Sequence, residues 1–173
     1  MDNGDKWLNK VYTCLNSLLR IEELELSCLI NTMNILGTKL KMKKLDWILL
    51  IDDDEIDRFI NEKIIRQCDV IFPVHTATDA YLALEWIEEK AQAILSNNES
   101  GLILLDINMP GMTGFEFLEA YNEKYSQLKN NVQVITLSSS NHRSDRQHML
   151  ELGASAYYSK PLNHEDFRTI LAV

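Results

Sequence analysis

The fold is indicated most clearly by one segment of the chain, Leu102-Ile103-Leu104-Leu105-Asp106-Ile107-Asn108-Met109-Pro110-Gly111. Its first four residues are apolar and stop at Asp106, and such a run is too short for a typical helix. The turn-forming residues that follow lead into a helical pattern that begins near Phe115. The order therefore predicts a buried strand, then a loop, then a helix.

The same order of strand, loop and helix recurs along the chain. We predict strands at residues 47–51, 70–74, 102–105, 132–137 and 156–159. We predict helices at residues 55–68, 79–95, from about 115, at 143–152 and after Asn163, which can cap a last helix reaching Val173. Pro73 favours an edge position for the second strand, because proline cannot donate to a neighbouring strand. The alternation predicts an α/β, doubly wound, five-stranded parallel sheet covered on both faces, with strand order 2-1-3-4-5.

Residues 1–44 lie outside this pattern and form a predicted N-terminal extension, followed by one domain at residues 45–173. Several apolar residues of the extension fall roughly on a heptad spacing, which Glu22 and Glu25 interrupt: Leu8, Val11, Leu15, Leu18, Leu29 and Leu36. One interpretation is an amphipathic helix that packs on the domain or on a second copy. The other is a loosely held extension, and a chain starting at Met42 would still contain the whole alternating pattern.

Composition argues against several classes of protein. A net charge of −9 repels a phosphate backbone, so we expect no direct binding of nucleic acid. Cys14, Cys28 and Cys68 form no closely spaced pair, which fits small buried residues in a reducing cytoplasm better than a disulfide framework. Polar residues interrupt the apolar stretch at 24–36, and we therefore expect no membrane-spanning segment.

Three carboxylates are predicted to meet at one edge of the sheet. Asp52 and Asp53 follow the first strand and Asp106 follows the third, and ligands of open parallel sheets bind at these carboxyl ends. Grouped carboxylates repel one another, so we expect a hard divalent cation, Mg²⁺ first, to bind between them. Helix capping is the alternative explanation, and it accounts for Asp54 and Glu55 but not for Asp106, which lies well before the next helix.

Two more strand ends carry polar side chains. Ser138 follows the fourth strand and Lys160 follows the fifth. A hydroxyl can donate to a phosphoryl oxygen, and an ammonium can pair with the charge that a phosphoryl group adds. Taken singly, such a serine is usually a turn former and such a lysine is usually solvated. Their combination with the three carboxylates is what points to phosphoryl chemistry.

These segments resemble the sequence motifs of response-regulator receiver domains of two-component signal transduction, stand-alone and similar to the chemotaxis receiver. The resemblance covers about residues 45–173 and is carried by five segments in the expected order: Ile51-Asp52-Asp53-Asp54, Ala77-Thr78-Asp79-Ala80, 105–111, Ser138-Ser139 and Gly153-Ala154 with Tyr157-Tyr158-Ser159-Lys160-Pro161. It implies the flavodoxin-like fold with the strand order given above.

The resemblance also implies a metal-dependent phosphoacceptor. Asp106 would accept the phosphoryl group, and Asp53 would ligate Mg²⁺ directly. Asp52 would assist directly or through water, and the carbonyl of Asn108 would supply a further ligand. Asp106 would itself be a metal ligand.

For the remaining residues, the resemblance implies that Ser138 and Lys160 hold the phosphoryl group and that Tyr157 is the switch aromatic, which turns inward on phosphorylation. It also implies a cis bond between Lys160 and Pro161. Ser138 stands where threonine is commoner in the family, and Ser139 stands where alanine is usual. Both changes should allow phosphotransfer, while the lifetime of the acyl phosphate depends on how water reaches it.

The implied partners are a sensor histidine kinase or a histidine phosphotransfer protein, and a downstream protein or a second copy of the chain as a homodimer. In this interpretation the chain is a signalling protein rather than an enzyme. One alternative is a degenerate receiver that binds a protein without being phosphorylated. Another is a phosphatase of the haloacid-dehalogenase type, but its site needs an Asp-x-Asp pair after the first strand and a cap domain. Here the acceptor would sit on a different strand.

Overall fold

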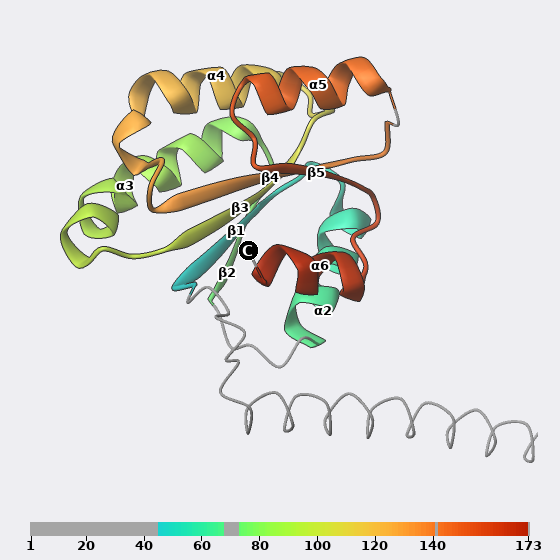
Figure 1. The fold of residues 1–173 in the computed structure, drawn as a ribbon, viewed down its shortest axis with the longest axis horizontal. Helices are drawn as coiled ribbons and strands as arrows, with labels where there is room; N and C mark the ends of the chain where they lie inside the picture. The colour runs from blue at the N-terminus through green and yellow to red at the C-terminus, as the bar shows by residue number, and fades with distance from the viewer. Residues whose placement is uncertain (1–44, 68–72, 141, 173) are drawn as a thin grey trace, which may run out of the picture. The chain divides into compact units, whose positions relative to one another are not determined.

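A computed structural model describes residues 45–67, 73–140 and 142–172, and a five-stranded parallel sheet forms the centre of this part of the chain (Figure 1). The strand order is β2-β1-β3-β4-β5, which confirms the predicted order. The strands are β1 Trp47–Ile51, β2 Val74–Ala77, β3 Gly101–Asp106, β4 Val132–Ser138 and β5 Ala156–Ser159. The heptad pattern of the extension and all three cysteines lie outside the described residues.

Helices cover both faces of this sheet, so the predicted doubly wound class is confirmed. Figure 1 shows α3, α4 and α5 on one face and α2 and α6 on the other. The helices are α2 Glu55–Gln67, α3 Ala80–Asn97, α4 Gly114–Lys124, the short 3₁₀ helix η1 Ser126–Leu128, α5 Arg143–Glu151 and α6 His164–Leu171. None of these helices is both long and apolar enough to cross a membrane.

The apolar side chains of the strands alternate between two cores. In β1, Leu49 and Ile51 pack in the core on the side of α3 and α4, whereas Ile48 and Leu50 pack in the core that contains α6. Every residue of β1 and β3 is buried, as expected for central strands of a parallel sheet covered on both faces. The two cores hold the strand ends in fixed positions, and these ends carry the polar side chains.

The second strand differs from the prediction. We expected a strand at residues 70–74, but β2 runs from Val74 to Ala77 and begins after Pro73, while residues 70–72 lie outside the described residues. Ile48 pairs with Val74 and Ile51 pairs with Ala77, which fixes the register on β1. The predicted edge position is correct, because β2 has a neighbour on one side only.

Side chains cap the starts of α3, α4 and α6. Asp79 Oδ1 accepts a hydrogen bond from Leu82 N at 2.9 Å at the start of α3. Thr113 and Glu116 form a reciprocal capping box at the start of α4. Asn163 Oδ1 accepts from Asp166 N at 2.8 Å, which confirms its predicted capping of α6.

Candidate functional site

Three carboxylates meet at the carboxyl ends of β1 and β3. Asp52 directly follows β1, and Asp106 is the last residue of β3. Each of Asp52, Asp53 and Asp106 offers one carboxylate oxygen, and these oxygens lie within 4.8 Å of one another. Asp52 and Asp106 are buried and Asp53 is exposed. The structure thus brings together the three acids that the sequence predicted to meet.

Lys160 inserts its ammonium group among these acids. Its Nζ lies 2.7 Å from Asp52 Oδ2 and 3.0 Å from Asp106 Oδ2, and it also lies 3.1 Å from Asp57 Oδ2. The lysine side chain is only 5% exposed. The bond from Lys160 to Pro161 is cis, as the resemblance implied. A lysine that the sequence alone would leave solvated is therefore enclosed by carboxylates.

The charges of this cluster are coupled. Burial raises the pKa of Asp52, and the neighbouring Lys160 only partly offsets that effect. Burial alone would lower the pKa of Lys160, but its hydrogen bond to Asp52 and the charges of Asp106 and Asp52 outweigh burial, so the pKa of Lys160 is raised. At neutral pH the lysine therefore remains a cation facing several carboxylates.

The donor set of the cluster fits a hard divalent cation. Mg²⁺ prefers oxygen ligands and is commonly held by one or two carboxylates with water and phosphate completing its shell. Asp52, Asp53 and Asp106 each offer a carboxylate oxygen, and these oxygens lie close enough together to bind one ion. Asn108 lies two residues beyond Asp106 in the same loop and is exposed.

The loop after β3 holds Asp106 closely. Ile107 N donates to Asp106 Oδ1 at 2.7 Å, and Gly114 N donates to Ile107 O at 2.8 Å. A Cβ atom added to Gly114 would lie 2.4 Å from the carbonyl oxygen of Asp106, so only glycine fits at the start of α4. The backbone that follows Asp106 therefore holds its carboxylate through Ile107 N and is itself tied to the start of α4.

Ser138 and Tyr157 are connected through Ser140. Ser138 is fully buried at the end of β4, and its Oγ accepts a hydrogen bond from Ser140 N at 3.0 Å. The hydroxyl of Tyr157 donates to Ser140 O at 2.7 Å. The Tyr157 ring is already buried in this conformation, at 8% exposure. A change at Ser138 can therefore reach Tyr157 through one intervening residue.

Sequence reasoning missed two residues of the first turns of α2. Asp57 contacts Lys160, as given above, and Arg58 Nη1 donates to the carbonyl oxygen of Asp52 at 2.6 Å. Both looked like charges on the solvated side of an amphipathic helix. Asp54 behaves as the capping explanation predicted, because its Oδ1 accepts from Ile56 N at 2.7 Å.

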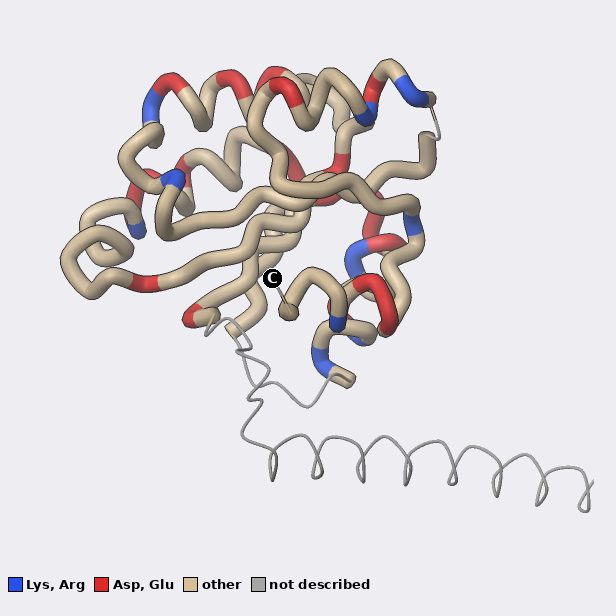
Figure 2. Tube along the Cα trace, viewed as in Figure 1, with Lys and Arg blue, Asp and Glu red and all other residues tan. Residues whose placement is uncertain are grey.

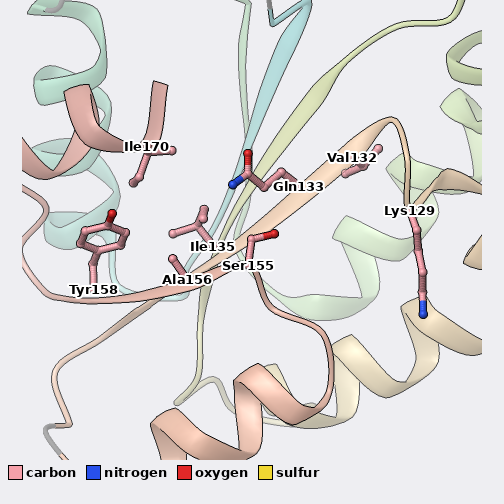
Figure 3. A pocket seen from close by; sticks show the side chains of 8 residues that line it. All are labelled: Lys129, Val132, Gln133, Ile135, Ser155, Ala156, Tyr158 and Ile170. Atoms are coloured by element: carbon pink, nitrogen blue, oxygen red, sulfur yellow. The ribbon is translucent and has the colours of Figure 1, made fainter. Parts of the chain in front are cut away.

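A separate hollow of about 320 Å³ lies beside β4, β5 and α6 (Figure 3). Ile135, Ala156, Tyr158 and Ile170 contribute to its lining. None of the clustered carboxylates lines it, and Lys160 does not either. The candidate site is therefore the charged cluster at the strand ends rather than this hollow.

Comparison with known proteins shows which family the chain resembles. The family model described as the response regulator receiver domain matches residues 48–172. The two-component response regulator ARR17 of Arabidopsis thaliana is 35% identical over 125 residues, covering 69% of this chain and 78% of ARR17. The sensor histidine kinase CheAY of Helicobacter pylori is 32% identical over 138 residues, covering 78% of this chain but only 16% of the kinase.

Solved structures show the same likeness. A two-component response regulator from Cytophaga hutchinsonii superposes with a TM-score of 0.65 at 31% identity, covering 74% of this chain and 95% of that protein. The chemotaxis protein CheY4 of Vibrio cholerae superposes with a TM-score of 0.55 at 26% identity, covering 74% of this chain and 97% of CheY4. In both comparisons nearly all of the related protein corresponds to part of this chain.

Proposed function

This chain belongs to the family of response regulator receiver domains, and from that premise we propose that it is switched by phosphorylation of Asp106. Membership in this family supports a phosphoacceptor role in two-component signalling. The observation that carries the assignment to Asp106 is its surroundings. Its Oδ2 lies 3.0 Å from Lys160 Nζ, and its carboxylate shares a 4.8 Å cluster with Asp52 and Asp53.

The proposed reaction is a transfer of the phosphoryl group to a carboxylate oxygen of Asp106. The oxygen attacks the phosphorus of a phosphohistidine in line, an O–P bond forms, and the N–P bond breaks as the imidazole leaves. Lys160 pairs with the equatorial phosphoryl oxygens, and the Ser138 hydroxyl donates a hydrogen bond to one of them. The protein thus orients the reacting groups and neutralises charge, and the donor supplies the phosphoryl group.

The metal in this proposal is Mg²⁺. Asp53 and Asp106 would hold it directly, with Asp52 and the carbonyl of Asn108 contributing further oxygens. When bound, it would neutralise the negative charge that the donor phosphoryl group brings to the carboxylates. Burial raises the pKa of Asp52 because it destabilises the ionised carboxylate. A bound cation would stabilise that carboxylate.

The proposed switch runs from Ser138 to Tyr157. A phosphoryl oxygen that draws on the Ser138 hydroxyl would disturb the hydrogen bond from Ser140 N to Ser138 Oγ. Because Tyr157 donates to Ser140 O, the aromatic ring would move with that loop. The surface around β5 and α5 would then differ between the unphosphorylated and the phosphorylated protein. To shift the ratio of the two conformations from 1:99 to 99:1, phosphorylation must favour one of them by about 5.5 kcal/mol.

The proposed donor is a sensor histidine kinase or a histidine phosphotransfer protein, and we place the exchange in the cytoplasm. The proposed reader of the switched surface is a downstream protein or a second copy of the chain. The receiver domain would extend over residues 45–173, with residues 1–44 as an extension. In this role the chain turns over no substrate beyond its own phosphoryl group.

Intact mass spectrometry tests the proposal. The protein is incubated with acetyl phosphate, with and without Mg²⁺, and we expect a gain of one phosphoryl group only when Mg²⁺ is present. Asp106→Asn should abolish the gain. Asp79→Asn is the matched control, because Asp79 caps α3 from the surface and asparagine caps equally well.

Three outcomes would contradict the proposal. Labelling of Asp106→Asn would place the acceptor elsewhere. A wild-type protein that stays unlabelled would indicate the degenerate receiver, which binds without being phosphorylated. Multiple turnover of a small phosphate ester would indicate a phosphatase, because a receiver loses only its own phosphoryl group.

A further inference from the structure

The cluster around Lys160 contains a third carboxylate in contact with its ammonium. Asp57 Oδ2 lies 3.1 Å from Lys160 Nζ, close to the 2.7 Å and 3.0 Å distances from Nζ to Asp52 and Asp106. Its side chain is 30% exposed, whereas those of Asp52 and Asp106 are buried. Asp57 therefore reaches the cluster from its solvent side, and it belongs to α2 rather than to a strand end.

The position of Asp57 sets up a competition for one ammonium group. Lys160 carries one positive charge and contacts three carboxylates. A phosphoryl group on Asp106 would need the same ammonium, because the negative charge of the acyl phosphate lies on its new oxygens. Any hold that Asp57 has on Lys160 must then weaken as the phosphoryl group arrives.

We propose that Asp57 is a positioning residue that holds Lys160 on the α2 side of the site, favouring the binding of the divalent cation and opposing the arrival of the phosphoryl group. This inference rests on the proposed phosphorylation of Asp106. In the unphosphorylated protein, Asp57 draws the ammonium toward α2 and leaves more of the negative charge of Asp52 and Asp106 free for a cation. Once the phosphoryl group is present, Asp57 competes with it for Lys160.

The two roles predict opposite effects of one substitution, Asp57→Asn. Without the Asp57 charge, Lys160 leans further toward Asp52 and Asp106, and we expect Mg²⁺ to bind about five-fold more weakly. At saturating Mg²⁺, the freed ammonium favours the anionic donor, so we expect the half-saturating concentration of acetyl phosphate to fall about five-fold. A loss of folding would weaken both measurements together and cannot produce this split.

The experiment combines isothermal titration calorimetry with Mg²⁺ and labelling rates measured by intact mass across a range of acetyl phosphate concentrations. Asp54→Asn is the matched control. Asp54 lies in the same acidic run and loses the same charge, but it caps α2 through Ile56 N at 2.7 Å and Asp57 N at 3.1 Å, which asparagine can also do. Asp57→Glu keeps the charge and should recover most of the Mg²⁺ affinity.

The inference is overturned if Asp57→Asn behaves like Asp54→Asn in both measurements, or if its two constants move in the same direction. Failure of the proposed function looks different, because wild-type protein would then gain no phosphoryl group at all. The Mg²⁺ titration remains decisive in that case: equal Mg²⁺ affinities for wild type and Asp57→Asn would still reject a role for Asp57.

Discussion

Gly114 shows how closely the chain is packed around Asp106. The added methyl group of Gly114→Ala would lie 2.4 Å from the carbonyl oxygen of Asp106 and 2.8 Å from the Cα of Ile107. Backbone atoms cannot turn away as a flexible side chain can, so the loop must shift. We expect the substitution to lower the free energy of unfolding by about 2 kcal/mol and to slow labelling of Asp106. Urea denaturation and labelling rates measure the two effects.

Glu119→Ala is a suitable control for this prediction. Glu119 lies on the same helix, α4, and is exposed. Removing a surface side chain of this kind should change the free energy of unfolding by no more than about 0.5 kcal/mol. If Gly114→Ala is as stable and as readily labelled as Glu119→Ala, the close packing around Asp106 affects neither the free energy of unfolding nor the labelling rate.

At the scale of single residues, the sequence predicted the cluster but not its full membership. Asp52, Asp53 and Asp106 stand at strand ends, and a parallel sheet brings its carboxyl ends to one edge, so their meeting could be inferred. Asp57 stands inside a helix, where charged residues usually face solvent. Its contact with Lys160 depends on how α2 leaves β1, and no local pattern in the sequence encodes that geometry.

Among the helices, the capping box of α4 gives a prediction with a defined pH dependence. Hydrogen bonds from the Thr113 backbone and hydroxyl lower the pKa of Glu116. The unfolded chain therefore binds more protons than the folded one as the pH falls, and the stabilising contribution of Glu116, present at neutral pH, is lost in acid. Glu116→Gln should make the melting temperature of the protein less sensitive to acid between neutral pH and the pKa of the folded carboxyl.

Thermal melts monitored by circular dichroism at several pH values would measure this difference. Glu119→Gln provides the comparison, since it removes an exposed carboxylate of the same helix that is not in the capping box. Parallel pH profiles for Glu116→Gln and wild type would contradict the assignment. So would an equally flattened profile for Glu119→Gln.

The elements that were predicted well and poorly differ in burial. β1 and β3 are entirely buried, so their sequences are continuous apolar runs that can be recognised directly. In β2 only Ala77 is buried, and the strand also contains the polar residues His75 and Thr76. An edge strand of this composition carries no apolar run, and the prediction placed it too early because the preceding residues are more apolar.

At the scale of the whole domain, a hydrogen bond of Asn61 connects α2 to the segment that follows Lys160. Asn61 is fully buried in α2, and its Oδ1 accepts a hydrogen bond from Leu162 N at 3.2 Å. Asn61→Ala would leave that N–H buried without its partner. We expect a loss of about 2 kcal/mol in the free energy of unfolding, measured by urea denaturation.

The same substitution should also loosen the segment that carries Lys160, because Leu162 lies two residues further along the chain. Asn97→Ala is the control, since Asn97 is exposed at the end of α3. Equal stability of the two variants would mean that the hydrogen bond between α2 and Leu162 contributes nothing measurable.

Charge is spread unevenly over the outer helices (Figure 2). Figure 2 shows acidic positions along α4 and two basic positions near the start of α5. Arg143 and Arg146 lie in those first turns of α5, next to the surface around Tyr157. If an acidic partner pairs with these two arginines, its binding should weaken as salt concentration rises.

The aromatic pair at the amino-terminal end of β1 has an optical consequence. Trp47 and Trp86 pack edge to face, with ring centroids 5.1 Å apart, and Trp47 starts the strand whose other end leads to Asp52. At about 3.3 Å per residue, the five-residue strand separates that indole from the acid cluster by roughly 16 Å. The fluorescence of these two indoles should therefore report unfolding of the sheet and should change little when Asp106, at the other end of the strands, is phosphorylated.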